Sequence, residues 1–231
     1  MTTTFWLKFI LKSDATFGRG DGVAGAVDSE VQHDAYGLPY LGGRTLKGLL
    51  GEECANILFA LECQGQAHPW KDVAKRLFGN PGSQDTDQSL MHVGDARLPE
   101  NLRQAVRQGV ERGELTREQV LHSLTAIRRQ MAVDAKTGAP RKETLRATRV
   151  ILRETPFEAA LTFLTDPTPD DLALLAACVK AFRRAGTGRN RGRGEVEAWL
   201  YDAQGRDVTN EHFTRFQQAI EQEAKNESLD L

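Results

Sequence analysis

Phe5-Trp-Leu-Lys-Phe-Ile-Leu-Lys12 is the most informative segment about the fold, because its side chains alternate with a period of two. Phe5, Leu7, Phe9 and Leu11 fall on one face, which is typical of a strand with one side on a core. The next segment, residues 18–43, contains seven glycines and several acids. So many breakers exclude a long regular element and indicate a functional loop, with a short strand near residues 30–33.

Further along the chain, two helices and four extended segments are predicted. Apolar residues recur at helical spacing from Leu46 to Leu61, with Thr45 in a position to cap the helix. A second helix start, Thr168-Pro-Asp-Asp171, leads into an apolar repeat that ends at Gly186. Extended segments are indicated at residues 90–93, 148–154, 157–163 and 196–200.

The confident elements run strand, helix, strand, strand, helix, strand. This order predicts an α+β protein with a ferredoxin-like or modified RNA-recognition-motif fold, an antiparallel sheet with two helices on one face. The other face of the sheet is left free for a partner.

The predicted domain comprises residues 1–206, and two additions to the basic fold are predicted within it. Thr116 begins an apolar stripe of Val120, Leu124, Ile127 and Met131, which indicates a helical insertion at about 98–132. A protruding hairpin is expected at about 132–153, around a turn signal at residues 134–140. Residues 207–231 form an acidic, polar C-terminal tail, interpreted as a solvated helix with a frayed end.

The composition excludes several classes of protein. Of the 231 residues, 40% are hydrophobic and 27% charged, which fits a globular domain rather than a disordered chain. The net charge of −2 supplies no global field toward nucleic acid, so any RNA binding must come from local patches. Apolar runs such as Ile57–Leu61 are too short to span a bilayer. With no signal peptide visible, the expected compartment is the cytoplasm.

The sequence contains no pattern typical of a zinc site or a disulfide. Cys54, Cys63 and Cys178 are odd in number and lie at apolar helical positions, so they are expected to be buried thiols. The five histidines are scattered without zinc-ligand spacing. Gly20-Asp-Gly-Val-Ala-Gly25 matches the dinucleotide fingerprint literally, but breakers follow it where that fingerprint requires a helix.

Two stretches carry the residue types that bind phosphate. Arg44 and Lys47 add positive charge to the first turn of a predicted helix, beside Gly48. The alternative for this stretch is tight packing by the glycines with exposed charges. Arg183-Arg-Ala-Gly-Thr-Gly-Arg-Asn-Arg-Gly-Arg193 has five arginines and no acid. Such a flexible, guanidinium-bearing loop suits a phosphate backbone without reading bases. The candidate RNA-binding residues are Arg44, Lys47, Gly48, Arg184, Gly186, Gly188, Arg189, Arg191 and Arg193.

A second basic stretch lies beside the predicted hairpin. It comprises Arg141, Lys142, Arg146, Arg149 and Arg153. RNA contact and a solvated strand edge are equally compatible with it.

These motifs resemble those of a known family, the RAMP superfamily of CRISPR-associated proteins. Gly25-Ala-Val-Asp28, Asp34, Gly37-Leu-Pro-Tyr-Leu41 and Arg44-Thr-Leu-Lys-Gly48 resemble its N-terminal signature, and residues 186–194 resemble its C-terminal glycine-rich loop. The resemblance is to backbone subunits of type III effector complexes and covers roughly residues 5–201. Leu-Gly-Gly-Arg-Thr replaces the usual Pro-Gly-Ser-Ser, and the insertion is long, so the subunit type stays open.

The resemblance implies a guide-RNA-binding subunit of a type III effector that cuts guide-paired target RNA. In such subunits an aspartate after the first strand cuts the target with a divalent metal, such as Mg²⁺, and its position corresponds to Asp28. Asp28 is then a metal ligand or helps to activate the 2′-hydroxyl. The implied partners are guide RNA, target RNA and other effector subunits, including copies of itself or related RAMP subunits.

Two other functions remain open. The chain can be a non-catalytic structural or end-capping subunit that only holds guide RNA. It can also be a guide-processing ribonuclease, for which His33 is the only histidine of the early loop.

Overall fold

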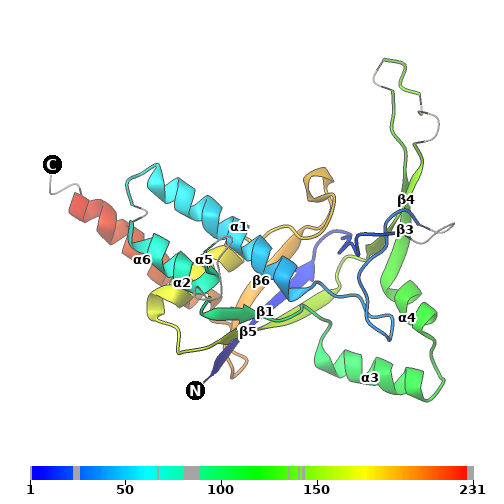
Figure 1. Cartoon of the computed structure of the whole chain (residues 1–231), viewed down its shortest axis with the longest axis horizontal. Helices are drawn as coiled ribbons and strands as arrows, with labels where there is room; N and C mark the ends of the chain where they lie inside the picture. Colours follow the sequence, from blue (N-terminus) through cyan, green and yellow to red (C-terminus); the bar gives the residue numbers. More distant parts are fainter. Residues whose placement is uncertain are drawn as a thin grey trace.

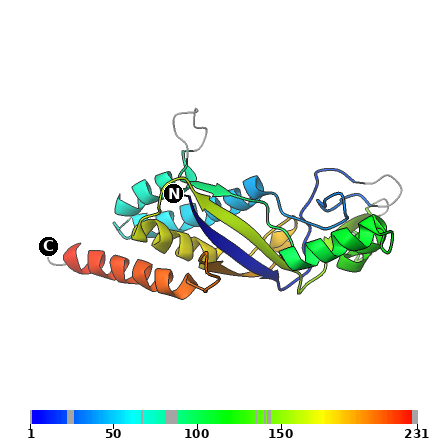
Figure 2. The same ribbon diagram turned by 90° about the horizontal axis from the view of Figure 1, so that it is seen from below.

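A computed structural model describes residues 2–22, 27–66, 68–80, 89–134, 136–139, 141 and 144–227. Figure 1 shows helices α1, α2, α5 and α6 at one end of the molecule and α3, α4 and a hairpin at the other, and Figure 2 shows the same separation. The elements are β1 (Thr3–Leu11), α1 (Gly43–Glu62), α2 (His68–Phe78), β2 (Met91–Val93), α3 (Glu100–Glu111), α4 (Arg117–Leu124), β3 (Thr125–Gln130), β4 (Arg146–Ile151), β5 (Pro156–Phe163), α5 (Pro169–Ala181), a 3-10 turn (Arg189–Arg191), β6 (Val196–Tyr201) and α6 (Thr209–Glu227).

The main sheet has the strand order β2-β5-β1-β6 and is antiparallel throughout. With α1 between β1 and β2 and α5 between β5 and β6, this is the ferredoxin-like arrangement, so the predicted fold is confirmed. The alternation of β1 sets the register. Leu7, Phe9 and Leu11 are buried on the inner face, where Phe9 stacks on Phe157 at 5.3 Å between ring centroids.

Helices α1 and α5 supply the apolar layer over this face. Leu46 and Leu50 of α1 and the run from Ala173 to Val179 of α5 are buried in the same core as the strands. Thr168 caps α5 as predicted, by accepting from the Asp171 N–H. Helix α1 begins at Gly43, two residues before the predicted cap at Thr45, because the Asp95 carboxylate accepts from the Gly43 N–H at 2.9 Å.

Helix α2 was not predicted from the sequence. Trp70, Val73 and Leu77 recur at helical spacing and are buried. Gly65, just before the helix, is a local breaker, and Pro69 lies in the first turn, where proline is compatible with a helix start. The helix is stabilised by burying those three side chains against the core, so tertiary packing decides this segment.

The insertion is only partly helical. Thr116 caps α4 with a complete capping box, as expected. The helix ends at Leu124, however, and residues 125–130 form strand β3 paired with β4. The prediction that Ile127 and Met131 lie on a buried helical stripe is wrong, since they are 43% and 48% exposed. The two strands form the protruding hairpin, which Figure 1 shows extending from the body, and it begins earlier than expected.

The C-terminal helix α6 packs one side against the domain, whereas the sequence predicted a solvated helix. Phe216 is 6% exposed, and its ring lies 4.8 Å from that of Trp70 on α2. His212 also contacts Phe5 of β1. Helix α6 therefore belongs to the core of the domain, although most of its outer residues are polar. The acidic composition of this segment hid the few apolar positions that dock it.

We expect Phe216→Ala to lower the free energy of unfolding by about 3 kcal/mol, because it removes a buried aromatic ring and leaves a cavity. Urea titration measures the change. Phe59→Ala is the control, since Phe59 is 68% exposed on α1 and its truncation should leave the midpoint nearly unchanged. Equal effects of the two substitutions would show that α6 does not dock as described.

Two of the three cysteines are buried as predicted. Cys54 and Cys178 lie in the core between α1 and α5, where a hydrogen bond with Cys54 and burial raise the pKa of Cys178. Cys63 is exposed, so its predicted burial is wrong, because it lies just beyond the last turn of α1. Among the described residues, no cluster of His, Cys, Asp and Glu side chains forms a metal site. No described helix is long and apolar enough to cross a bilayer.

Candidate nucleic-acid interface

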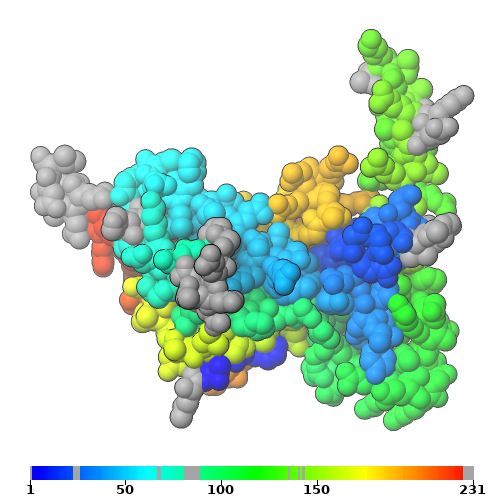
Figure 3. Space-filling view, in the orientation of Figure 1, coloured from blue at the N-terminus to red at the C-terminus, as the bar shows by residue number. Residues whose placement is uncertain are grey.

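Three segments distant in sequence meet on one face of the molecule. Figure 3 shows the loop between α5 and β6 in gold beside the segment after β1 in blue, with the hairpin in green next to that segment. Gly18 pairs with Val31, and a Cβ at Gly18 would lie 3.6 Å from Thr187 of the gold loop. Ser29 in turn pairs with Thr148 of β4. The segment after β1 therefore connects the hairpin to the arginine-rich loop.

The arginine loop, residues 183–194, is held at its base by main-chain hydrogen bonds. The Ala185 N–H donates to the Gly194 carbonyl at 2.7 Å, and the Thr187 N–H donates to the Thr16 carbonyl at 2.9 Å. Glycine is required at 194, where φ is +69° and a Cβ would lie 1.9 Å from the Ala185 oxygen. The glycines thus bring the loop against the segment after β1 and give it a fixed shape.

The arginines of this loop differ in how they are paired. Arg189 makes a two-pronged ion pair with Glu52 of α1, both contacts at 2.9 Å, and this hydrogen bonding raises the pKa of Arg189. Arg184 donates to the Arg189 carbonyl. Arg191 and Arg193 have no carboxylate partner within the described part of the chain. Two cations are therefore available to phosphate without breaking an ion pair.

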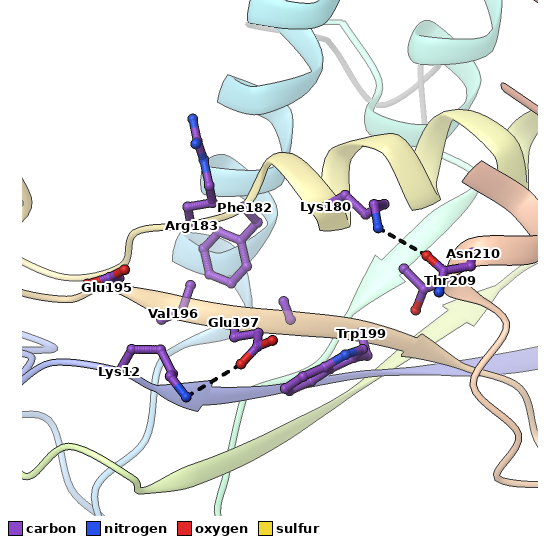
Figure 4. Close-up of a pocket in the computed structure, with 11 residues that line it drawn as sticks. Lys12, Lys180, Phe182, Arg183, Glu195, Val196, Glu197, Trp199, Thr209 and Asn210 are labelled. Carbon is purple, nitrogen blue, oxygen red and sulfur yellow. Dashed lines mark hydrogen bonds and ion pairs between the residues drawn. The ribbon is translucent and has the colours of Figure 1, made fainter. Parts of the chain in front are cut away.

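The hollows on either side of Arg183 do not suit an anion. One, of about 390 Å³, is lined by Glu52, Glu53 and Glu195 as well as by arginines. The other, of about 410 Å³, lies along β6. Figure 4 shows its lysines engaged, Lys12 with Glu197 and Lys180 with Asn210. Arg183 points away from β6 in the same view.

The start of α1 presents one free cation and one engaged cation. Arg44 is exposed, with no carboxylate partner among the described residues. Lys47 points inward and donates to Ser89 and to the Met91 carbonyl, and its burial lowers the pKa of the ammonium. A Cβ at Gly48 would touch no atom of the described residues within 4 Å, so packing against them does not explain that glycine.

Asp28 lies beside the start of hairpin strand β4. Its N–H donates to the Ala147 carbonyl at 2.8 Å, and its Oδ2 accepts from the Ala147 N–H at 2.6 Å. These two bonds fix the carboxylate against the start of β4, while the residue is exposed. Within the described ranges its Oδ1 has no partner. Residues 25 and 26, which belong to the resembling signature, lie outside the described residues.

The other described aspartates of this region are already engaged. Asp14 pairs with Arg128 at 2.8 Å, and Asp21 pairs with Arg19 at 2.7 Å. Asp34 accepts from two main-chain N–H groups, those of residues 36 and 38. Asp28 is therefore the exposed carboxylate in this set that no cation neutralises. His33, the alternative catalytic residue, has its Nδ1 3.1 Å from the Asp34 carbonyl oxygen, within its own loop.

The second basic stretch, of which only Arg146 and Arg149 lie on β4, does not act as a unit. Arg149 is 8% exposed and pairs with buried Glu30 at 2.8 Å, so it is neither an RNA contact nor a solvated edge. Arg146 and Arg153 are exposed. Arg141 lies 3.8 Å from Asp134, and Lys142 lies outside the described residues. The Arg149–Glu30 pair links β4 to the Asp28 segment, and local sequence patterns did not predict it.

We expect Glu30→Gln to destabilise the fold by about 3 kcal/mol, because it leaves the Arg149 guanidinium buried without its counterion. Chemical denaturation of the purified chain measures the loss. The double variant Glu30→Met with Arg149→Met should recover much of it, since neither buried charge remains. A single variant as stable as the parent chain would contradict the buried pair.

Comparison with known proteins gives a family and a fold. The model of the RAMP superfamily matches residues 8–197. No curated protein matches. Among solved structures, a chain of the type III-B Cmr-beta complex bound to cognate target RNA is 13% identical, with a TM-score of 0.57 over 87% of this chain and 97% of that chain. A chain of the apo Cmr-beta complex is 14% identical, with a TM-score of 0.61 over 86% and 97%. At such identity these structures share the fold.

Proposed function

The chain belongs to the RAMP superfamily, and we propose that it is a guide-RNA-binding subunit of a type III CRISPR ribonucleoprotein effector. The proposed partners are guide RNA, target RNA and other effector subunits. The similar solved chains come from type III-B complexes, one of them bound to cognate target RNA, which supports this assignment.

One observation carries the proposal. The arginine loop lies on the same face as the Asp28 segment and the hairpin, and its Arg191 and Arg193 have no acidic partner among the residues that the structure describes. Guanidinium groups on a shaped glycine loop bind successive phosphates and leave the bases unread. That is the recognition a subunit needs if it must hold guides of any sequence.

The proposal includes cutting of target RNA at Asp28. An exposed carboxylate fixed by Ala147 can accept a proton from a 2′-hydroxyl or hold a cation beside a phosphodiester. No described cluster holds a metal by protein groups alone. Mg²⁺ commonly takes one or two carboxylates and completes its shell with water and substrate phosphates, so Asp28 with RNA fits it. The ion would offset the charge that develops on the phosphate.

A structural subunit is the second candidate. The observation that favours it is that the described chain offers no second acid or base hydrogen-bonded to Asp28. A backbone subunit that only holds guide RNA would keep the arginine loop and would not depend on Asp28.

The nucleic acid that co-purifies with the full chain tests the proposal. Expressed with its neighbouring effector subunits, the chain should retain short RNA that ribonuclease removes and deoxyribonuclease does not. Complexes that assemble without RNA, or that carry DNA, would contradict it.

A further inference from the structure

We propose that the groove between α1 and α2 receives one nucleotide of the bound RNA, with its base on the apolar floor and its phosphate at the basic rim. This inference rests on the proposed function and adds a second binding position, separate from the arginine loop. The groove has a volume of about 570 Å³, enough for a base and its sugar.

The floor of the groove is apolar and is made by both helices. Ala55 and Leu58 of α1 face Ala74 and Phe78 of α2 across it. Phe78 is half-buried, so part of its ring remains open to a ligand. Aromatic rings bind bases by stacking without selecting among them, because every base has a π-face.

Among the described residues, every charged side chain that lines the groove is positive. These side chains are Arg44, Lys47, Lys71 and Lys75, and no described carboxylate lies among them. Lys71 pairs with Glu62 outside the groove at 2.8 Å, whereas Arg44 and Lys75 have no carboxylate partner in the described chain. The hollow beside Arg189 differs, because three glutamates line it. Charge complementarity therefore favours an anionic ligand in the α1–α2 groove.

The groove continues from the start of α1, where RNA is expected. Gly48 and Gly51 line it, and a Cβ at Gly48 would meet no atom of the described part of the chain within 4 Å. A backbone with a sugar and phosphate can approach α1 closely at these positions. Since Arg44 belongs both to the predicted phosphate contacts and to the rim, an RNA strand there lies within reach of the groove.

The test compares a substitution that fills the groove with the same substitution at a position of α1 outside the groove. Ala55 and Ala60 are both exposed on α1, but only Ala55 lines the groove. The affinity of the full chain for an oligouridylate of about 12 nucleotides is measured by fluorescence anisotropy. We expect Ala55→Trp to weaken binding about tenfold or more, the order of one lost stacking contact, and Ala60→Trp to leave it unchanged.

Two further measurements separate base entry from general damage. Lys75→Glu changes no packed side chain and should also weaken binding. For an abasic ribose-phosphate oligomer of the same length, the parent chain and Ala55→Trp should bind equally, because no base enters the groove.

Three results would overturn the inference. Unchanged affinity of Ala55→Trp, together with weakened binding when Arg189, Arg191 and Arg193 are all replaced by Gln, would show that RNA binds elsewhere, and the proposed function would stand. Loss of assembly with other subunits, with oligouridylate affinity intact, would assign the groove to a protein partner. A parent chain that binds no oligouridylate would contradict both the groove and the proposed function.

Discussion

Asp28→Asn is expected to slow cutting of guide-paired target RNA by about 10³-fold, within the range that one positioned acid–base group contributes. The substitution keeps the size of the side chain and an oxygen that can accept from the Ala147 N–H. It removes the negative charge that would hold a cation or take a proton. The assembled effector is incubated with matched target RNA and Mg²⁺, and product formation at this subunit's position is followed with time.

Asp21→Asn is the matched control, since Asp21 is an exposed aspartate of the same region and is paired with Arg19. Its cutting rate should equal that of the parent complex. If Asp28→Asn cuts at the parent rate, Asp28 is not the catalytic carboxylate. If the intact parent complex never cuts at this position, the chain is a structural subunit.

Neutralising Arg189, Arg191 and Arg193 together, each to Gln, is expected to lower RNA affinity about 100-fold, because charge-assisted contacts with phosphate are lost. The salt dependence should flatten as well. Each phosphate contact on a single strand contributes about 0.7 to the slope of log K against log salt, so two lost contacts lower it by about 1.4. Arg191 and Arg193 account for these two, since Arg189 is paired with Glu52.

The control replaces three arginines on or beside α3, namely Arg103, Arg107 and Arg112, which lie away from the arginine loop. This variant has the same change in net charge. Its slope of log K against log salt should equal that of the parent chain if the phosphate contacts are confined to the arginine loop. A parent slope in the arginine-loop variant would mean that the loop does not touch phosphate.

The sequence predicted the parts of the fold that local periodicity encodes. The alternation of residues 5–12 gave β1 correctly, and the cap at Thr168 gave the start of α5. Periodicity failed where two structures share one spacing. Ile127 fits a helical stripe with Val120. In the structure, however, Ile127 lies on strand β3 of the hairpin, where its side chain is exposed and its backbone is opposite Arg149 of β4. Only the pairing with a strand distant in sequence decides between those outcomes.

The candidate site shows the same limit. The arginines and glycines of residues 183–194 were identified from the local sequence, because a glycine-rich run with five arginines and no acid is seldom needed for packing alone. Their pairing was not predictable, since Glu52 and Arg189 are 137 positions apart and Glu30 and Arg149 are 119 apart. The basic rim at Lys71 and Lys75 was not predicted, because helix α2, which carries both lysines, was not predicted either. Their helical spacing, followed by Phe78, was the available signal.

A structure of the assembled complex with guide RNA shows directly whether the chain binds an RNA backbone through its arginine loop. We expect phosphate oxygens at about 2.8 Å from the guanidinium groups of Arg191 and Arg193, with the bases turned away from the loop. Guide RNA bound elsewhere on the chain, with the arginine loop in solvent, would contradict it.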